Sequence, residues 1–116
     1  MDTRPALAPH LLMESKGPWT GPSCAAFLRD ARDLARIGHP VQLLLIQDGV
    51  GAAVRDPSAS AGTREVAEAG GEIWVDDFSL AQRGLSDSDL LPSARVVGMS
   101  EVSARVLDPA VKVVWH

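Results

Sequence analysis

The sequence contains a single cysteine, Cys24, and no tyrosine among its 116 residues. One thiol cannot form an internal disulfide, which favours a reducing, cytoplasmic setting. One Cys and three dispersed His give no cluster of metal ligands, so neither a metal nor another cofactor is expected. Basic residues form no cluster and the net charge is −4, which argues against a nucleic-acid-binding surface. Apolar runs stay well below the roughly 20 residues of a membrane span, and the first residues lack a signal-peptide core.

The residues that are present alternate between short apolar runs and segments of helical periodicity, which is typical of βαβ units. The run PVQLLLI is apolar enough for a strand buried on both faces. The pattern predicts one domain over residues 1–116, with an α/β fold: a three-layer α/β/α sandwich with a five-stranded, mainly parallel, flavodoxin-like sheet. The expected strands are 10–14, 40–46, 72–75, 94–99 and 111–115; the expected helices are 23–37, 50–55, 63–69, 77–83 and 100–107, with a flexible loop at 56–62.

Ligands of such sheets collect outside the carboxyl ends of the strands. The loops expected at that edge are 15–23, 47–50, 76–77 and 99–100, together with the end of the last strand. None carries a G-x-G-x-x-G or Walker phosphate loop, and no G-x-S-x-G elbow occurs. Flavin or nucleotide binding would therefore rest on fold analogy alone.

Cys24 maps to this edge, in the first turn of the first expected helix. The helix dipole and the free N–H groups there favour a thiolate, which makes Cys24 a candidate catalytic residue. The opposing interpretation is burial, because Cys24, Leu28, Ala31 and Ala35 fall at helical spacing and free cysteines are commonly buried. The residues alone favour burial, and both interpretations stay open.

Further polar residues map to the same edge. Asp76 and Asp77 follow the third strand, and we expect Asp77 to cap the next helix while its neighbour is solvated. These carboxylates would raise the pKa of Cys24 if the first and third strands were adjacent, and would have a weak effect if the second strand lay between them. Asp48 lies in the turn after the second strand. His116 can approach Cys24 only if the fifth strand borders the first, and the other two histidines precede strands and belong at the opposite edge.

The three tryptophans, Trp19, Trp74 and Trp115, also map to this edge. Tryptophan is enriched in interface hot spots, so the three side chains together predict a partner surface or an apolar pocket. The competing interpretation is that they cap the core.

Four segments resemble, in order, the DsrE/DsrF/DsrH-like proteins: SKGPWTGPSCAAFL, LLLIQDGVGAAV, DDFSLAQRGL and ARVVGMSEVSARVLDPAVKVVWH. The match is best to the DsrH/TusB branch, in which an aromatic loop precedes a cysteine in the first helix and the chain closes on a tryptophan. An acidic-Gly-Val turn after the second strand is also similar. The resemblance covers nearly the whole chain and implies a single DsrE/DsrH-like domain.

The family resemblance implies sulfur relay, in which a cysteine persulfide passes sulfur between donor and acceptor proteins for tRNA thiolation or sulfur oxidation. It also implies trimers or hexamers, either homo-oligomers or hetero-oligomers with DsrE/DsrF-like subunits. The DsrE-type cysteine follows the third strand, where this chain has Asp76 and Asp77, so Cys24 remains the candidate persulfide thiol. We predict a subunit of such a relay, or at most a sulfurtransferase-type carrier. The alternative is a non-catalytic oligomeric interaction protein on the same fold.

Overall fold

The computed structural model describes residues 7–116 and places its strands in one five-stranded sheet, in the order β4-β3-β2-β1-β5. Every neighbouring pair is parallel. The strand order, which the sequence left open, puts β5 beside β1, unlike the flavodoxin order 2-1-3-4-5. The strands are β1 His10–Glu14, β2 Val41–Leu45, β3 Glu72–Asp76, β4 Ala94–Val97 and β5 Lys112–Trp115; the helices are α1 Pro22–Ile37, α2 Pro57–Glu68, α3 Asp77–Gln82 and α4 Met99–Val106, with short 3-10 helices η1 Gln47–Ala53 and η2 Asp87–Asp89.

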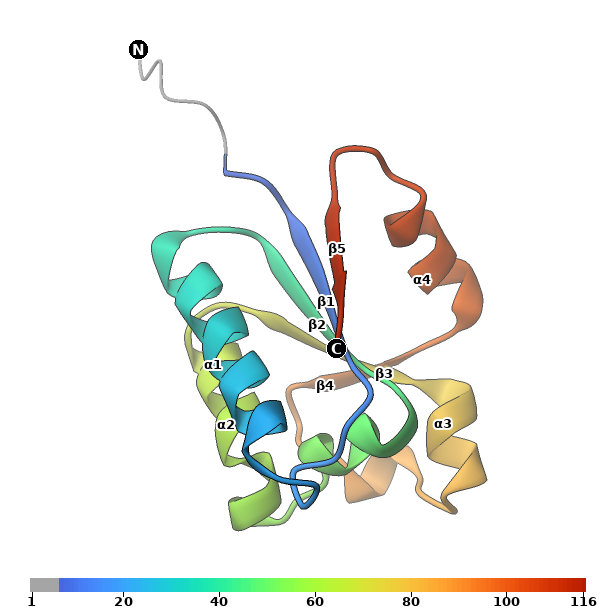
Figure 1. Ribbon diagram of the computed structural model, residues 1–116. Coiled ribbons are helices and arrows are strands. Elements are labelled where there is room, and N and C mark those ends of the chain that lie inside the picture. Colours follow the sequence, from blue (N-terminus) through green and yellow to red (C-terminus); the bar gives the residue numbers. More distant parts are fainter. Residues whose placement is uncertain (1–6) are drawn as a thin grey trace.

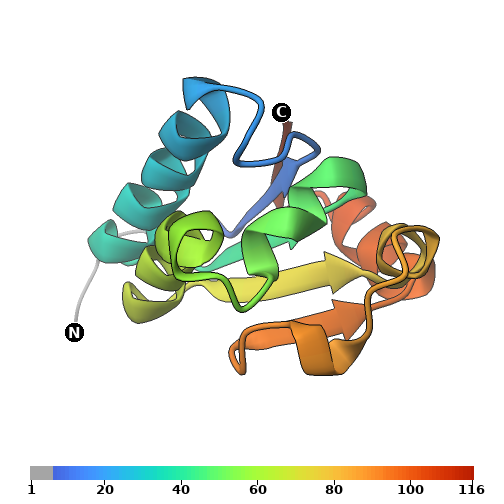
Figure 2. The same ribbon diagram turned by 90° about the horizontal axis from the view of Figure 1, so that it is seen from below.

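Helices cover both faces of the sheet, which confirms the three-layer α/β prediction. α1 and α2 pack on one face, and α4 lies on the other (Figure 1). Figure 2 shows α2 between α1 and η1 on the first face. No helix within residues 7–116 is long and apolar enough to cross a membrane.

The core is divided by the sheet into two clusters because side chains of a strand alternate between its faces. In β1, Leu12 packs with the α1 and α2 side, whereas Leu11 and Met13 pack with the α4 side. β2 is buried along its whole length, as its continuous apolar run predicted. The α4 side is less well covered, since α4 has only eight residues and Val113 and Trp115 of β5 stay exposed.

The loop expected at 56–62 is wrong, because α2 begins at Pro57. Asp56 caps the helix by accepting the Ser58 N–H at 3.0 Å, and a proline suits the first turn, where its missing N–H has no partner to lose. Small residues of this segment then pack inward: Ser60 and Thr63 are buried, and Thr63 Oγ1 donates to the backbone of η1. Tertiary packing therefore fixes a helix that composition alone disfavoured.

The caps of α3 and α4 also differ from the prediction. Asp76, rather than Asp77, caps α3, because its carboxylate accepts the N–H of Ser79 while Asp77 is already helical and exposed. Gly98, rather than Ser100, stands before α4. The prediction of one capping and one solvated aspartate holds, with the two roles exchanged.

Candidate functional site

The carboxyl ends of the parallel strands meet at one edge, and the predicted site residues lie along it. β2 separates β1 from β3, so the segment that carries Cys24 and the segment that carries Asp76 are not direct neighbours. β5 borders β1 and brings His116 beside the end of β1. The predicted residues therefore fall into separate groups along the edge.

Glu14 and His116 form one group, where β1 and β5 end. The Glu14 side chain is fully buried, and His116 Nδ1 lies 2.8 Å from its Oε2 and 3.0 Å from its Oε1. The Lys16 N–H donates to Oε1 at 2.9 Å, and the Phe27 ring stacks on His116 with 4.9 Å between centroids. The Ser15 N–H and Oγ both donate to the His116 carbonyl. A buried carboxylate needs such partners, and here they fix the imidazole against Glu14.

Cys24 lies in the first turn of α1 with 1% of its surface exposed. Leu28, Ala31 and Ala35, which share its helical phase, lie in the same core cluster. Burial, and in second place the negative charge of Glu14, raises the pKa of the thiol from 9.0 to about 11. These two effects keep the thiol protonated at neutral pH.

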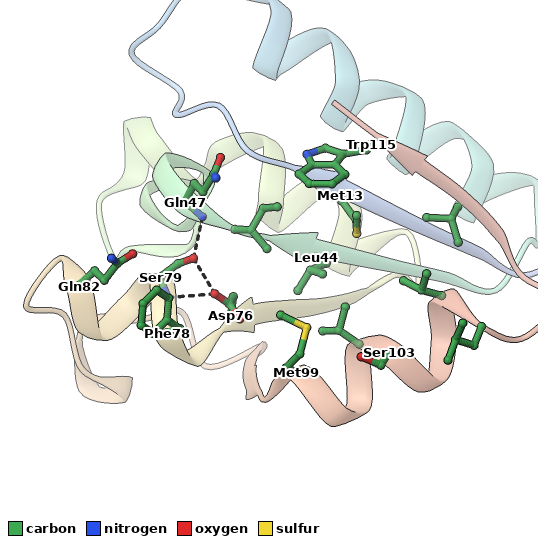
Figure 3. A pocket seen from close by; sticks show the side chains of 15 residues that line it. Met13, Leu44, Gln47, Asp76, Phe78, Ser79, Gln82, Met99, Ser103 and Trp115 are labelled. Carbon is green, nitrogen blue, oxygen red and sulfur yellow. Dashed lines mark hydrogen bonds between the residues drawn. The ribbon is translucent and has the colours of Figure 1, made fainter.

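A groove of about 650 Å³ opens at the same edge, on the α4 side of the sheet (Figure 3). Met13 and Leu44 line it from the sheet, Met99 from the first turn of α4, and Trp115 from β5. The groove exists because α4 is short and leaves part of an apolar sheet face uncovered. We call this cavity the α4 groove.

Asp76 also lines the α4 groove and is only 7% exposed. Its Oδ2 accepts two hydrogen bonds from Ser79, from the backbone N–H at 2.9 Å and from Oγ at 2.6 Å. Ser79 Oγ in turn accepts the Gln47 N–H at 2.8 Å (Figure 3). Gln47 has a φ of 51°, a left-handed conformation that is uncommon for a residue other than glycine. This chain of bonds ties the ends of β2 and β3 together at the groove.

Trp19 and Asp48 belong to a second cavity, of about 440 Å³, with Arg83. Asp48 pairs with Arg83 at 2.8 Å. The Trp19 ring lies against Gly17 and Gly51, where any Cβ would collide with it, although 65% of the residue is exposed. Two glycines thus provide the flat surface on which this indole rests.

The three tryptophans do not share one surface. Trp74 is buried in the middle of β3, and the Arg95 guanidinium lies 5.1 Å from its ring centroid. Trp19 and Trp115 are each 65% exposed, but they line different cavities. Trp74 is therefore a core residue, and only Trp115 contributes to the α4 groove.

Glu14, Ser79 and Gln47 were not among the site residues predicted from the sequence. Glu14 was visible as the one charged residue in the strand HLLME, but its partner lies 102 positions away in the chain. Ser79 stands three residues after Asp76, a spacing at which an N-cap receives a backbone N–H, and this signal was available. No local pattern marks the conformation of Gln47.

This edge offers a groove that can hold a ligand and a thiol with little thiolate at neutral pH. The thiol is buried and protonated, whereas the α4 groove offers an apolar wall with one carboxylate. No group of three or more His, Cys, Asp or Glu side chains in residues 7–116 is placed to hold a metal ion.

Comparisons with known proteins fit this architecture. The ychN protein from E. coli superposes with a TM-score of 0.83 at 16% identity, over 95% of this chain and 100% of that one. MTH1491 from Methanobacterium thermoautotrophicum, described as a protein of unknown function, gives 0.76 at 17% identity, over 93% of this chain and 99% of that one. At such identities these structures show the fold alone.

No curated protein matches the sequence significantly. The model of the DsrE/DsrF-like family matches residues 11–115, from the second residue of β1 to the end of β5. This match includes every strand and helix described above, so the chain belongs to the DsrE/DsrF-like family.

Proposed function

We propose that this chain is a non-carrier subunit of a sulfur-relay assembly, related to the DsrH/TusB branch of its family. The observation that carries the proposal is the environment of its one thiol. With a pKa of about 11, about one Cys24 side chain in ten thousand is a thiolate at pH 7. The thiolate is the form that attacks sulfur, so a buried, protonated Cys24 is a poor carrier.

The residues after β3 support the same proposal. The resemblance to DsrE-type proteins puts the relay cysteine there, and this chain has Asp76 and Asp77 instead. The Asp76 carboxylate is engaged by Ser79 and caps α3, which is a structural role. The proposed contribution of the chain is therefore a binding surface, with the sulfur carried by other subunits.

Association with identical or DsrE/DsrF-like subunits is part of this proposal. β5 is an edge strand whose four residues are all exposed, among them Val113, Val114 and Trp115. An exposed apolar edge strand is a template for pairing with another chain. The open edge of β5 supports association with another chain, whereas a trimer or hexamer is what the family resemblance implies.

The carrier alternative is tested by intact-mass measurement after incubation with glutathione persulfide. A carrier thiolate would attack the outer sulfur, break the S–S bond, release glutathione thiolate and gain about 32 Da. We expect no such adduct on the native chain and an adduct on the chain unfolded in denaturant. An adduct on the native chain that is absent in Cys24→Ser would show that Cys24 is a carrier and would overturn the proposal.

The relay role is tested with DsrE-like and DsrF-like companion subunits and a labelled persulfide donor. We expect Cys24→Ser to support sulfur transfer as well as the wild-type chain, and omission of the chain to stop it. Transfer that continues without the chain would instead favour a non-catalytic interaction protein outside the relay.

A further inference from the structure

The α4 groove has a polar end and a mainly apolar middle. Figure 3 shows most of the polar side chains at one end, beside Phe78, whereas mainly apolar side chains from the sheet and α4, with Ser103 among them, occupy the middle. Its volume of about 650 Å³ lies within the usual range of about 300–1,000 Å³ for small-molecule sites. The residues at the polar end are Gln47, Asp76, Ser79 and Gln82.

One carboxylate oxygen at the polar end is free to accept a bond. Asp76 Oδ2 already accepts two bonds from Ser79, and Oδ1 has no partner within residues 7–116. Within residues 7–116, the fully buried side-chain polar atoms that lack a hydrogen-bond partner are Trp74 Nε1 and Arg105 Nε. Oδ1 of Asp76 is not among them. The small exposed part of Asp76 therefore includes this oxygen, in a residue that lines the groove.

The negative charge of the groove favours a ligand with a positive charge. Asp76 is the only charged side chain among the described residues that line it. The whole chain carries a net charge of −4, which adds to the attraction of cations. A cationic N–H donor bound to this oxygen would form a charge-assisted hydrogen bond, the stronger class of such bonds.

The walls select the body of the ligand. Met13 and Met99 are unbranched and adapt to irregular shapes, and their sulfurs pack well against aromatic rings. Phe78 and Trp115 add aromatic surface at the rim and are 67% and 65% exposed. An aromatic or branched aliphatic group would remove these side chains from water, which is the favourable term in binding.

We infer that the α4 groove binds a small amphipathic amine, with its ammonium group on Asp76 Oδ1 and its apolar body between Met99 and Trp115. This site does not depend on the proposed relay function. It needs no reactive thiol, and the ligand is bound without being changed.

The test compares three probes of one shape and different charge: phenethylamine, phenethyl alcohol and hydrocinnamate. Each is titrated into the full chain while backbone amides are followed by two-dimensional NMR. We expect the amine to bind about tenfold more tightly than the alcohol, as one charge-assisted bond predicts, and the carboxylate to bind most weakly. The shifts should centre on the amides of Gln47, Ser79 and Met99.

Asp76→Asn is the informative variant, because asparagine also caps helices well and α3 should persist. It should weaken the amine about tenfold and leave the alcohol unchanged. Asp77→Asn is the matched control, since Asp77 is exposed and does not line the groove. Equal binding of amine and alcohol, a preference that survives Asp76→Asn, or shifts away from the groove would overturn the inference. So would the absence of binding, as expected if a second copy or another polypeptide covered the groove.

Discussion

At the scale of single residues, the buried carboxylate of Glu14 controls the electrostatics where β1 ends. It is held by His116 and by the N–H of Lys16, and its charge also acts on Cys24. Burial and this charge both disfavour the thiolate, whereas the start of α1 favours it. The raised pKa, about 11, reflects burial first and the charge of Glu14 second.

Cys24 should therefore react slowly with iodoacetamide in the native chain. A pKa of about 11 in place of 9.0 leaves about a hundredfold less thiolate at pH 8. We expect the alkylation rate, followed by intact mass, to rise up to about pH 11 in the native chain, but to level off near pH 9 in the unfolded chain. A native rate that levels off below pH 9 would contradict the raised pKa.

The raised pKa of Cys24 also predicts how the free energy of unfolding changes with pH. Because the native pKa is raised, the contribution of the thiol to stability is complete below pH 9 and is lost as pH rises towards 11. Cys24→Ser has no thiol to ionise, so its free energy of unfolding should fall less between these pH values than that of the wild type.

At the scale of elements, α2 shows how a segment rich in small residues becomes a packed helix. A Cβ at Gly62 would crowd the Leu28 side chain of α1, so the absence of one allows the two helices to approach. Thr63 Oγ1 donates to the Ala52 carbonyl at 2.6 Å, which joins α2 to η1. Asp56 determines where α2 begins.

The elements that the sequence predicted well are those with a strong apolar period. The phase of Cys24 and Leu28 marked the buried side of α1, and PVQLLLI marked a central strand. The start of α2 was missed because Ser and Gly favour loops when judged locally, although Asp56 followed by Pro57 is a helix-start signal. The tryptophans predicted a partner surface or an apolar pocket at this edge, and Trp115 does line the α4 groove. The rest of its lining was not predicted, because it depends on β5 pairing with β1 and no local pattern carries strand order.

The Asp56 cap predicts a pH-dependent stability of α2. Hydrogen bonds from the side chain and backbone of Ser58 lower the pKa of Asp56 below its ordinary 3.8. The stabilisation is therefore present above about pH 4 and is lost as pH falls through the native pKa. We expect the thermal midpoint of the wild type to fall more steeply in acid than that of Asp56→Asn, which caps without titrating.

Asp56→Ala provides the control, since loss of the cap should lower its midpoint by a few degrees relative to Asp56→Asn at every pH, and relative to the wild type only above about pH 4. If the thermal midpoints of the wild type and Asp56→Asn fell in parallel with pH, the carboxylate charge of Asp56 would not contribute to the stability of α2.

At the scale of the whole molecule, the position of β5 produces the two surface features on which the proposals rest. Because β5 pairs with β1 on one side only, its other side is an open edge. Because β5 has four residues and α4 has eight, the sheet face between them is left as the α4 groove. In this chain, β5 thus leaves a groove on one face of the sheet and an unpaired strand at its edge.

The proposed association can be separated from the groove by a substitution on the opposite face of β5. Val114 pairs in register with Leu12, whose side chain faces α1, and does not line the α4 groove. Val114→Lys places a charge on the edge strand, a substitution that opposes edge-to-edge pairing. We expect light scattering at micromolar concentration to give a multiple of 12.3 kDa for the wild type and about 12.3 kDa for Val114→Lys.

Ile37→Lys is the matched control for that measurement. Ile37 is 67% exposed at the end of α1, so the substitution adds the same charge to an apolar surface residue away from β5. The control should keep the assembled mass, because its charge does not lie on an edge strand. A wild-type mass of 12.3 kDa would contradict self-association, and equal loss of assembly in both variants would trace it to charge rather than to the edge of β5. Unchanged assembly in Val114→Lys would place the contact on another surface. The exposed apolar residues of β5 would then not indicate a partner.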